Sequence, residues 1–127
     1  MKKIILLSLI LSMCFCTACG NTSKIDARME KVAEQMISAV DQYLDFEIEA
    51  DEAEEKVANL YTRLVEPSDD ASKEEKDLYL YITHLDSQMR YTSYQTIKKD
   101  AEGLAKAEEN VLNARNNISR IIGAKKR

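Results

Sequence analysis

The sequence predicts an all-α protein, in its simplest form a long antiparallel helical hairpin of the coiled-coil type. The 127 residues include one proline and three glycines, which is few for a turn-rich β fold. Residues with high helix propensity are abundant instead. Apolar residues recur at steps of three and four along most of the chain, the period of an amphipathic helix. A compact three- or four-helix bundle is the alternative architecture with the same pattern.

We expect residues 25–66 to form one continuous helix. Apolar steps of four and three alternate along this stretch, and residues 45–55 contain no Gly, Pro, Asn or Ser to mark a turn. The seam consists of Ile25, Met29, Val32, Met36, Ala39, Tyr43, Phe46, Ala50, Ala53, Val57, Leu60 and Leu64. A competing interpretation places a turn at residues 45–51, with Asp51 capping a new helix and Glu54 completing a capping box. The unbroken seam favours continuity.

A turn over residues 67–72 separates this helix from a second one over residues 73–122. The proline at the start of the turn lacks an N–H and disfavours helix in the residue before it. Ser72 and Glu75 then form an S-x-x-E capping box. The apolar seam of the second helix weakens over residues 92–103, where we expect a bend or a break.

The apolar stripes of both helices are too wide for a hairpin of two helices. Either two chains pair as a homodimer, or one chain bends within residues 92–103 and covers itself. In the hairpin, the turn at residues 67–72 lies at the end far from the N-terminus. The hairpin therefore predicts an acidic, tyrosine-bearing end that points away from whatever holds the N-terminus.

Residues 1–18 have the layout of an export signal that is removed from the mature protein. Lys2 and Lys3 precede an apolar run over residues 4–15, and small residues follow it. The run is shorter than the ~20 residues that a membrane-spanning helix needs. An ordinary secretory signal cut near Ala18 is one of two interpretations.

The other interpretation rests on the tripeptide Thr17-Ala18-Cys19, which resembles the lipobox of bacterial lipoproteins. Cys16 departs from that pattern, since such lipoproteins usually carry leucine there. The resemblance implies a diacylglyceryl thioether on Cys19, a lipidated tether over residues 19–24, and a single helical domain over residues 25–127. It also implies a location on the outer side of the cytoplasmic membrane, or in the outer membrane of a Gram-negative cell.

Charge is distributed unevenly along the chain. Residues 45–77 contain 13 acidic and 4 basic residues, whereas residues 98–127 contain 8 basic and 4 acidic ones. The formal net charge of −4 argues against a nucleic-acid partner. On a helix, Asp45, Glu49 and Glu52 would form one stripe. Such a stripe is either a solvated face or a docking patch for a basic partner.

Two further groups are candidates for contacts with other molecules. The first group is three tyrosines near the hairpin turn: Tyr61, Tyr79 and Tyr81. They either fringe the core or contribute to a protein-binding surface. The second group is the basic tail: Lys125, Lys126 and Arg127. The tail either contacts lipid headgroups near Cys19 or stabilises the C-terminal end of the helix, where the helix dipole favours cations.

The sequence offers little for catalysis. His84 is the only histidine, and no G-x-S-x-G, HExxH or glycine-rich phosphate loop is present. We therefore expect no enzyme activity, cofactor or metal, and a membrane-anchored interaction or structural module of the cell envelope with an unknown protein partner. The alternative is a lipoprotein that binds a small molecule or peptide between its helices, in an apolar pocket around Met36 and Leu104.

Overall fold

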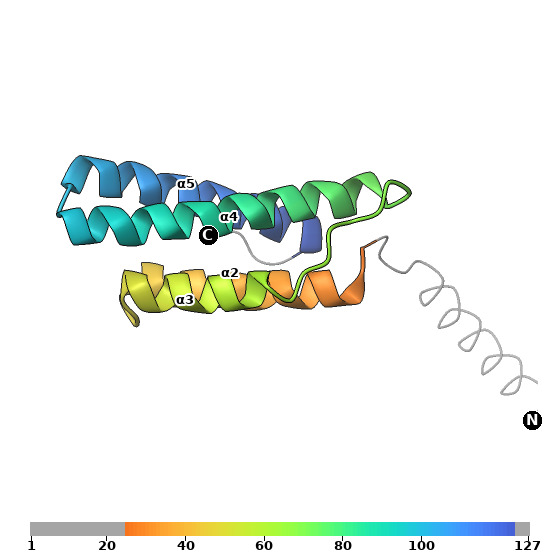
Figure 1. Ribbon diagram of the computed structural model, residues 1–127, viewed down its shortest axis with the longest axis horizontal. Coiled ribbons are helices and arrows are strands. Elements are labelled where there is room, and N and C mark those ends of the chain that lie inside the picture. The colour runs from red at the N-terminus through yellow and green to blue at the C-terminus, as the bar shows by residue number, and fades with distance from the viewer. Residues whose placement is uncertain (1–24, 124–127) are drawn as a thin grey trace, which may run out of the picture.

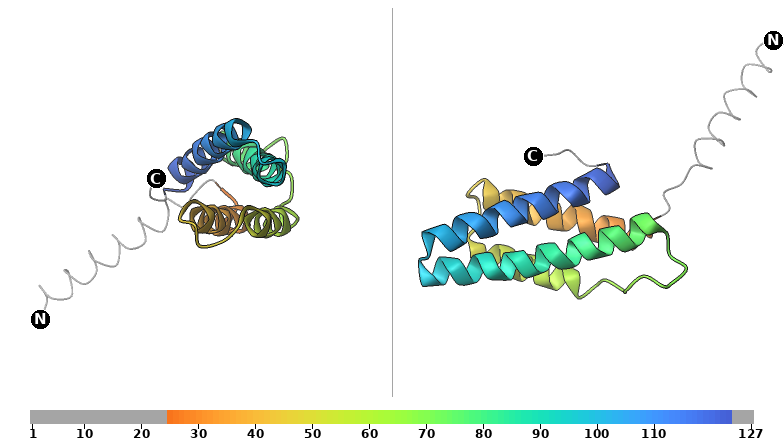
Figure 2. Two further views of the ribbon diagram at one scale, coloured as in Figure 1. Left: turned by 90° about the vertical axis from the view of Figure 1, so that its left-hand side faces the viewer. Right: turned by 90° about the horizontal axis from the view of Figure 1, so that it is seen from above.

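The computed structural model describes residues 25–123, and these residues form four α-helices and no β-strand. The helices are α2 (Ala27–Leu44), α3 (Ala50–Tyr61), α4 (Lys73–Lys98) and α5 (Ala101–Ile122). Consecutive helices run antiparallel and pack side by side, and α2 also packs against α5, which closes the ring (Figures 1 and 2). The all-α prediction is therefore confirmed, and the architecture is the four-helix bundle rather than the hairpin.

The core is built from the apolar faces of all four helices. Its completely buried large apolar side chains are Met36, Val40, Val57, Leu78, Ile82, Leu85, Met89, Val111 and Ile118. These residues belong to the two predicted seams or flank them. One chain thus covers its own wide apolar stripes, which removes them from water without a second copy.

The break between α2 and α3 corrects the prediction of one helix over residues 25–66. The helical path stops over residues 45–49, so the competing turn at residues 45–51 is closer to the structure. The cap differs from that alternative as well, because α3 begins after Glu49 rather than Asp51. The carboxylate of Glu49 makes no capping hydrogen bond.

The backbone at the end of α2 explains how a helix stops here without a glycine. Phe46 has a φ of 61°, in the left-handed region. Its N–H donates to the carbonyl of Tyr43 at 3.0 Å, and the N–H of Glu47 donates to the carbonyl of Gln42 at 2.8 Å. This pair of bonds is the Schellman motif, whose left-handed position usually holds glycine. With phenylalanine there, the sequence carries no turn signal.

The second break falls inside the region predicted over residues 92–103. Lys99 takes the left-handed conformation with a φ of 57°, and the N–H of Asp100 donates to the carbonyl of Gln95 at 3.2 Å. Asp100 also caps α5, because its Oδ1 accepts the N–H of Gly103 at 3.0 Å. A tight turn of two residues therefore joins α4 to α5.

The bundle has two different ends. The N-terminal end holds the start of α2 and the loop over residues 62–72, where the N–H of Asp26 donates to Oε2 of Glu75 at 3.2 Å. The opposite end, here called the distal end, holds the turns at residues 45–49 and 99–100 (Figures 1 and 2). The loop with the predicted acidic turn thus lies beside the start of the bundle, not at the far end as the hairpin predicted.

Several predictions concern residues that the structure does not describe. The signal over residues 1–18, Cys19, and the tail of Lys125, Lys126 and Arg127 lie outside residues 25–123. Within that described range, none of the helices is both long enough and apolar enough to cross a membrane.

Candidate functional site

The distal end of the bundle gathers exposed apolar side chains. Phe46 in the α2–α3 turn is 95% exposed and Ile97 near the end of α4 is 75% exposed. Tyr91 and Tyr94, on the last turns of α4, are about half exposed. We call these four residues the distal surface. Large apolar side chains that are exposed together at one end of a protein often mark a contact site.

Phe46 is presented in a way that folding alone does not explain. A left-handed backbone costs a residue with a Cβ about 1–2 kcal/mol. The exposed ring gains little from packing to offset this cost. Strained positions of this kind cluster at functional sites. The combination of strain and exposure therefore points to a contact outside the chain.

Tyr91 and Tyr94 form an ordered aromatic face on α4. Their ring centroids lie 6.5 Å apart with an interplanar angle of 27°. The Nζ atom of Lys98 lies 5.2 Å from the centroid of the Tyr94 ring. These residues are neighbours because positions three and four apart share a helix face. The two rings are already stacked in the unbound chain, and a preformed surface lowers the entropic cost of binding.

A hollow of about 300 Å³ lies next to Ile97, between the start of α3 and the end of α4. It is lined by Glu49, Ala50 and Asp51 on one side and by Ser93, Thr96 and Ile97 on the other. Ala50 and Ser93 are both buried and small, so the two helices leave room between them. The hollow thus has small or apolar walls and two exposed carboxylates at its rim.

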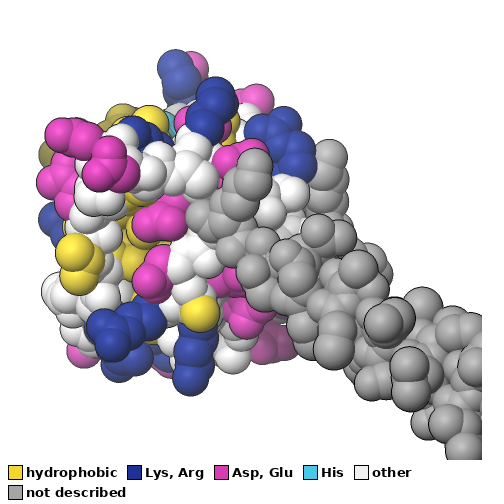
Figure 3. All heavy atoms as spheres, turned by 90° about the vertical axis from the view of Figure 1, so that its right-hand side faces the viewer, with side chains coloured by type: hydrophobic (Ala, Val, Ile, Leu, Met, Phe, Trp, Pro, Cys, Tyr) yellow, Lys and Arg dark blue, Asp and Glu magenta, His cyan; other side chains and the backbone are white. Residues whose placement is uncertain are grey.

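The distal end is strongly acidic on the α3 side. Residues 45–55 hold seven carboxylates and no basic residue, whereas residues 98–102 are balanced, with two lysines and two acids. Glu52 pairs with Lys56 at 3.1 Å. At the N-terminal end, in contrast, acidic and basic side chains are mixed over the visible face (Figure 3).

The predicted acidic stripe is present at this end but has a different form. Because the helix breaks, Asp45 and Glu49 belong to the turn, and only Glu52 lies in α3. The three residues therefore do not form one helical stripe. Glu49 lies at the rim of the hollow beside Ile97, whereas Glu52 pairs with Lys56, which also contacts Gln42 of α2.

The three predicted tyrosines lie elsewhere and serve packing. Tyr61, Tyr79 and Tyr81 are half-buried against the core, toward the N-terminal end. The hydroxyl of Tyr61 lies 3.2 Å from Oγ1 of Thr83, a contact between α3 and α4. A hydrogen bond with Tyr61 raises the pKa of Tyr79. The structure does not bring these tyrosines together with the acidic residues of the distal end.

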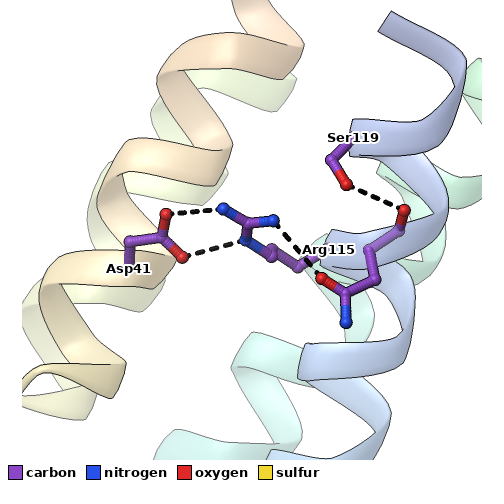
Figure 4. Close-up of polar contacts among 4 residues, drawn as sticks. Asp41, Arg115 and Ser119 are labelled. Atoms are coloured by element: carbon purple, nitrogen blue, oxygen red, sulfur yellow. Dashed lines mark hydrogen bonds and ion pairs between the residues drawn. The ribbon is translucent and has the colours of Figure 1, made fainter. Parts of the chain in front are cut away.

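A polar clamp between α2 and α5 was not foreseen from the sequence (Figure 4). The guanidinium of Arg115 donates from Nε to Oδ1 of Asp41 at 2.9 Å and from Nη2 to Oδ2 at 2.8 Å. Its Nη1 donates to Oδ1 of Asn116 at 3.3 Å, and the hydroxyl of Ser119 donates to the Asn116 carbonyl at 2.9 Å. The only sequence signal for this clamp is a charged residue directly after Ala114, a residue of the apolar seam.

A second interhelical bond lies nearer the distal end. The hydroxyl of Tyr43 donates to Oε1 of Glu108 at 2.6 Å. Burial, together with this carboxylate, raises the pKa of Tyr43 far above its ordinary value. The hydroxyl is therefore a fixed donor, and its bond holds α2 against α5.

Two residues singled out in the sequence, His84 and Met36, lie in different surroundings. Residues 25–123 contain no cluster of three histidine, cysteine or acidic side chains placed to hold a metal. His84 is exposed on α4. Met36 is completely buried in the core. An open groove of about 400 Å³ lies between α2 and α3, and its lining is mostly polar, including Gln35, Gln42, Lys56 and Arg63.

No known family model, curated protein or solved structure matches this chain.

Proposed function

We propose that this protein is a lipid-anchored, non-enzymatic interaction module of the cell envelope that binds a protein partner through its distal surface. One observation carries the proposal: the exposed apolar side chains of Phe46, Tyr91, Tyr94 and Ile97 gather at the end opposite the start of the bundle. Aromatic residues of this kind dominate the binding energy of many protein interfaces.

The anchor is proposed from the resemblance of Thr17-Ala18-Cys19 to a lipobox. A tether over residues 19–24 then leads to α2 at the N-terminal end of the bundle. The 26 residues of α4 span about 39 Å at ~1.5 Å per residue. Such an anchor would hold the N-terminal end at the membrane and would present the distal surface about that far from it.

The rigidity of the bundle supports a docking role. The Arg115–Asp41 clamp and the Tyr43–Glu108 bond both tie α2 to α5. The two exposed tyrosines of α4 stack on each other. A surface that is already ordered loses little conformational entropy when a partner binds.

Photo-crosslinking in intact cells tests the docking role. We would replace Phe46 with the crosslinking amino acid p-benzoylphenylalanine, which keeps an aromatic ring at that position. Leu80 is the matched control, because it is 64% exposed but lies beside the loop at the N-terminal end. We expect one defined adduct from position 46, its loss on Ile97→Ser, and no such adduct from position 80. The same adducts from both positions would contradict the proposal.

A separate measurement tests the anchor. The Cys19→Ser variant cannot carry the thioether, so we expect it to leave the membrane fraction. Wild-type protein should remain there after washing with high salt, which removes proteins held by charge alone. A variant that stays with membranes would contradict lipidation at Cys19, whereas the docking role would still be judged by the crosslinks.

The second candidate function is binding of a small molecule or peptide. The groove between α2 and α3 favours it, because amide and cationic side chains line the groove and suit a polar, anionic ligand. Its lysine is already engaged by Gln42 at 3.2 Å and by Glu52, which reduces the cationic charge on offer. Arg63→Gln should weaken the binding of such a ligand and should leave the crosslinked adduct from position 46 unchanged. This difference separates the two functions.

A further inference from the structure

We infer that the partner presents a cationic, amphipathic segment to the distal surface. Its apolar side chains would cover Phe46 and Ile97, and its basic groups would lie over the turn at residues 45–49. This inference rests on the proposed docking function and adds the chemistry of the partner. It is carried by three features: the local charge, the shape of one hollow, and the aromatic face beside it.

The first feature is an excess of carboxylates at the distal end. Residues 47–55 hold six acidic residues and no basic one, whereas Lys98 and Lys99 are offset by Asp100 and Glu102. Lys56 follows the acidic stretch and pairs with Glu52. No ion pair within residues 25–123 involves Glu47, Glu49 or Asp51. Like charges crowded together repel one another, and a basic partner relieves that repulsion. The same field steers a cationic partner toward this end and slows an anionic one.

The second feature is the hollow between α3 and α4. Ala50 and Ile97 give it apolar walls, and the carboxylates of Glu49 and Asp51 stand at its rim. A lysine or arginine side chain has a matching profile, because its aliphatic stem packs on apolar surface while its charged head remains outside. A partner carboxylate would be repelled at this rim. The hollow therefore selects for a basic side chain.

The third feature is the aromatic face of α4. The ring of Tyr94 already holds the ammonium group of Lys98 at 5.2 Å, which illustrates that this face accepts a cation. Tyr91 is stacked beside it and is 44% exposed. Arginine stacks on such rings especially well. Apolar contact and cation recognition therefore lie on adjoining parts of one surface.

Binding of two synthetic peptides tests the inference. One peptide is an amphipathic helix with leucine on one face and lysine on the other, and its counterpart has glutamate in place of every lysine. Fluorescence anisotropy would measure their dissociation constants for the full exported chain carrying Cys19→Ser. We expect the lysine peptide to bind at least about tenfold more tightly than the glutamate peptide. That preference should shrink as salt is raised, because salt screens exposed charges.

Matched variants locate the binding site. Ile97→Ser removes an apolar side chain from the hollow, and the double change Glu49→Lys with Asp51→Lys reverses its rim. Each should weaken the lysine peptide by about tenfold or more, as is typical of central interface residues. Leu80→Ser removes an exposed apolar side chain of similar size at the other end and should leave the affinity unchanged. All of these positions are exposed, and circular dichroism would check that each variant remains helical.

The peptide-binding and crosslinking results test the cationic-partner inference and the docking function separately. Equal affinity for both peptides would overturn the cationic-partner inference. So would a dissociation constant for the lysine peptide that changes neither with Ile97→Ser nor with the rim reversal. If crosslinks from position 46 instead identify an acidic partner segment, the docking function stands and this inference fails. If the lysine peptide binds as expected but no adduct forms in cells, the surface chemistry stands and the docking function fails.

Discussion

Three residues of the described chain have a positive φ: Phe46, Lys99 and Gly123. Each lies at the end of a helix, where a left-handed residue redirects the chain. Glycine takes this conformation without a steric cost, whereas residues with a Cβ do not. The helix ends at Phe46 and Lys99 therefore carry a backbone strain that glycine would avoid. The strain at Phe46 is the more notable, because its ring is also exposed.

Phe46→Gly should separate stability from binding. The change relieves the left-handed strain, but glycine is more flexible in the unfolded chain, which offsets part of this gain. We therefore expect the free energy of unfolding to rise by up to about 1 kcal/mol. Urea denaturation would measure it. Lys99→Gly is the control, because it relieves the same backbone strain and removes no aromatic ring. The lysine peptide should lose affinity only for Phe46→Gly. A fall in stability for that variant alone would mean that the ring packs on the fold after all.

Asp86 is a second residue whose position is costly. It lies in α4 and is 6% exposed, its Oδ2 pairs with Arg90 at 3.0 Å, and its Oδ1 has no hydrogen-bond partner within residues 25–123. Burial raises the pKa of this carboxyl, Arg90 opposes the rise, and Glu54 of α3 adds to it. The folded state therefore binds a proton more readily than the unfolded chain does.

This shift gives Asp86→Asn an expected dependence on pH. Stability falls as pH rises from the ordinary pKa of aspartate to the raised value in the fold, and the penalty persists above that window. Asparagine has the same size and no charge, so the variant should be more stable at pH 7 by about 1 kcal/mol. The gain should shrink as pH falls toward about 4. Thermal melts across pH would measure it, with the exposed Glu55→Gln as the control for net charge. A gain that is the same at every pH would contradict this account.

At the scale of elements, two kinds of contact hold α2 in the bundle. Its apolar face packs on the core, and Asp41 pairs with Arg115 of α5. The Arg115 side chain is 6% exposed, whereas Asp41 is 27% exposed. Breaking one half of such a pair leaves a charge in a poorly hydrated place, which costs more than the pair itself contributes.

Asp41→Ala should therefore be clearly destabilising. We expect a loss of about 3 kcal/mol, because the Arg115 guanidinium would remain buried without its carboxylate. Lys73→Ala is the comparison, since it removes the exposed ion pair with Asp77 and should cost less than about 1 kcal/mol. Chemical denaturation of both variants would give the difference. Similar small losses would indicate that water or another side chain replaces Asp41.

The elements also show what the sequence could and could not predict. Ser72 does cap α4, with its Oγ accepting the N–H of Glu75 at 3.2 Å, as the capping box predicted. The α4–α5 turn lies within the predicted residues 92–103. The α2–α3 break was only the competing interpretation, because Phe46 keeps the apolar spacing while its ring is exposed to solvent. Spacing records residue types and not backbone angles, so it cannot detect a helix that ends on a strained phenylalanine.

The candidate site was predicted in part for the same reason. Asp45, Glu49 and Glu52 were identified as a charged group from sequence alone. Tyr91 and Tyr94 were not joined to them, although the predicted hairpin already sets residues 45–49 opposite residues 90–94, because both stretches are about equally far from the turn at residues 67–72. The missing information was that the first helix ends at Leu44. That break turns the middle of the predicted hairpin into one end of the bundle, with the start of α3 beside the end of α4.

At the scale of the whole molecule, the bundle makes a dimer unnecessary for covering the core. The homodimer was one of two ways to cover apolar stripes that are too wide for two helices. The four helices α2 to α5 of one chain cover them instead. We therefore expect the Cys19→Ser chain to sediment as a monomer at micromolar concentration. A dimer that Ile97→Ser dissolves would instead assign the distal surface to self-association.

The topology also fixes which end an anchored molecule would show. A lipid on Cys19 and a tether over residues 19–24 would keep the N-terminal end near the bilayer, because six residues reach at most about 20 Å. New cysteines at positions 47 and 69 would test this, since Glu47 lies in the distal turn and Asp69 in the loop at the other end.

On right-side-out membrane vesicles, a bulky maleimide should label Glu47→Cys several-fold faster than Asp69→Cys. Both positions are exposed on the isolated bundle, so the two rates should become similar once detergent releases the protein. Under the proposed anchoring, the signal cysteines would be removed and a lipid would block Cys19, which would leave the new thiol as the reactive one. Equal labelling rates on the vesicles would mean that the bundle lies along the membrane. The distal surface would then be too close to the bilayer for the docking role proposed for it.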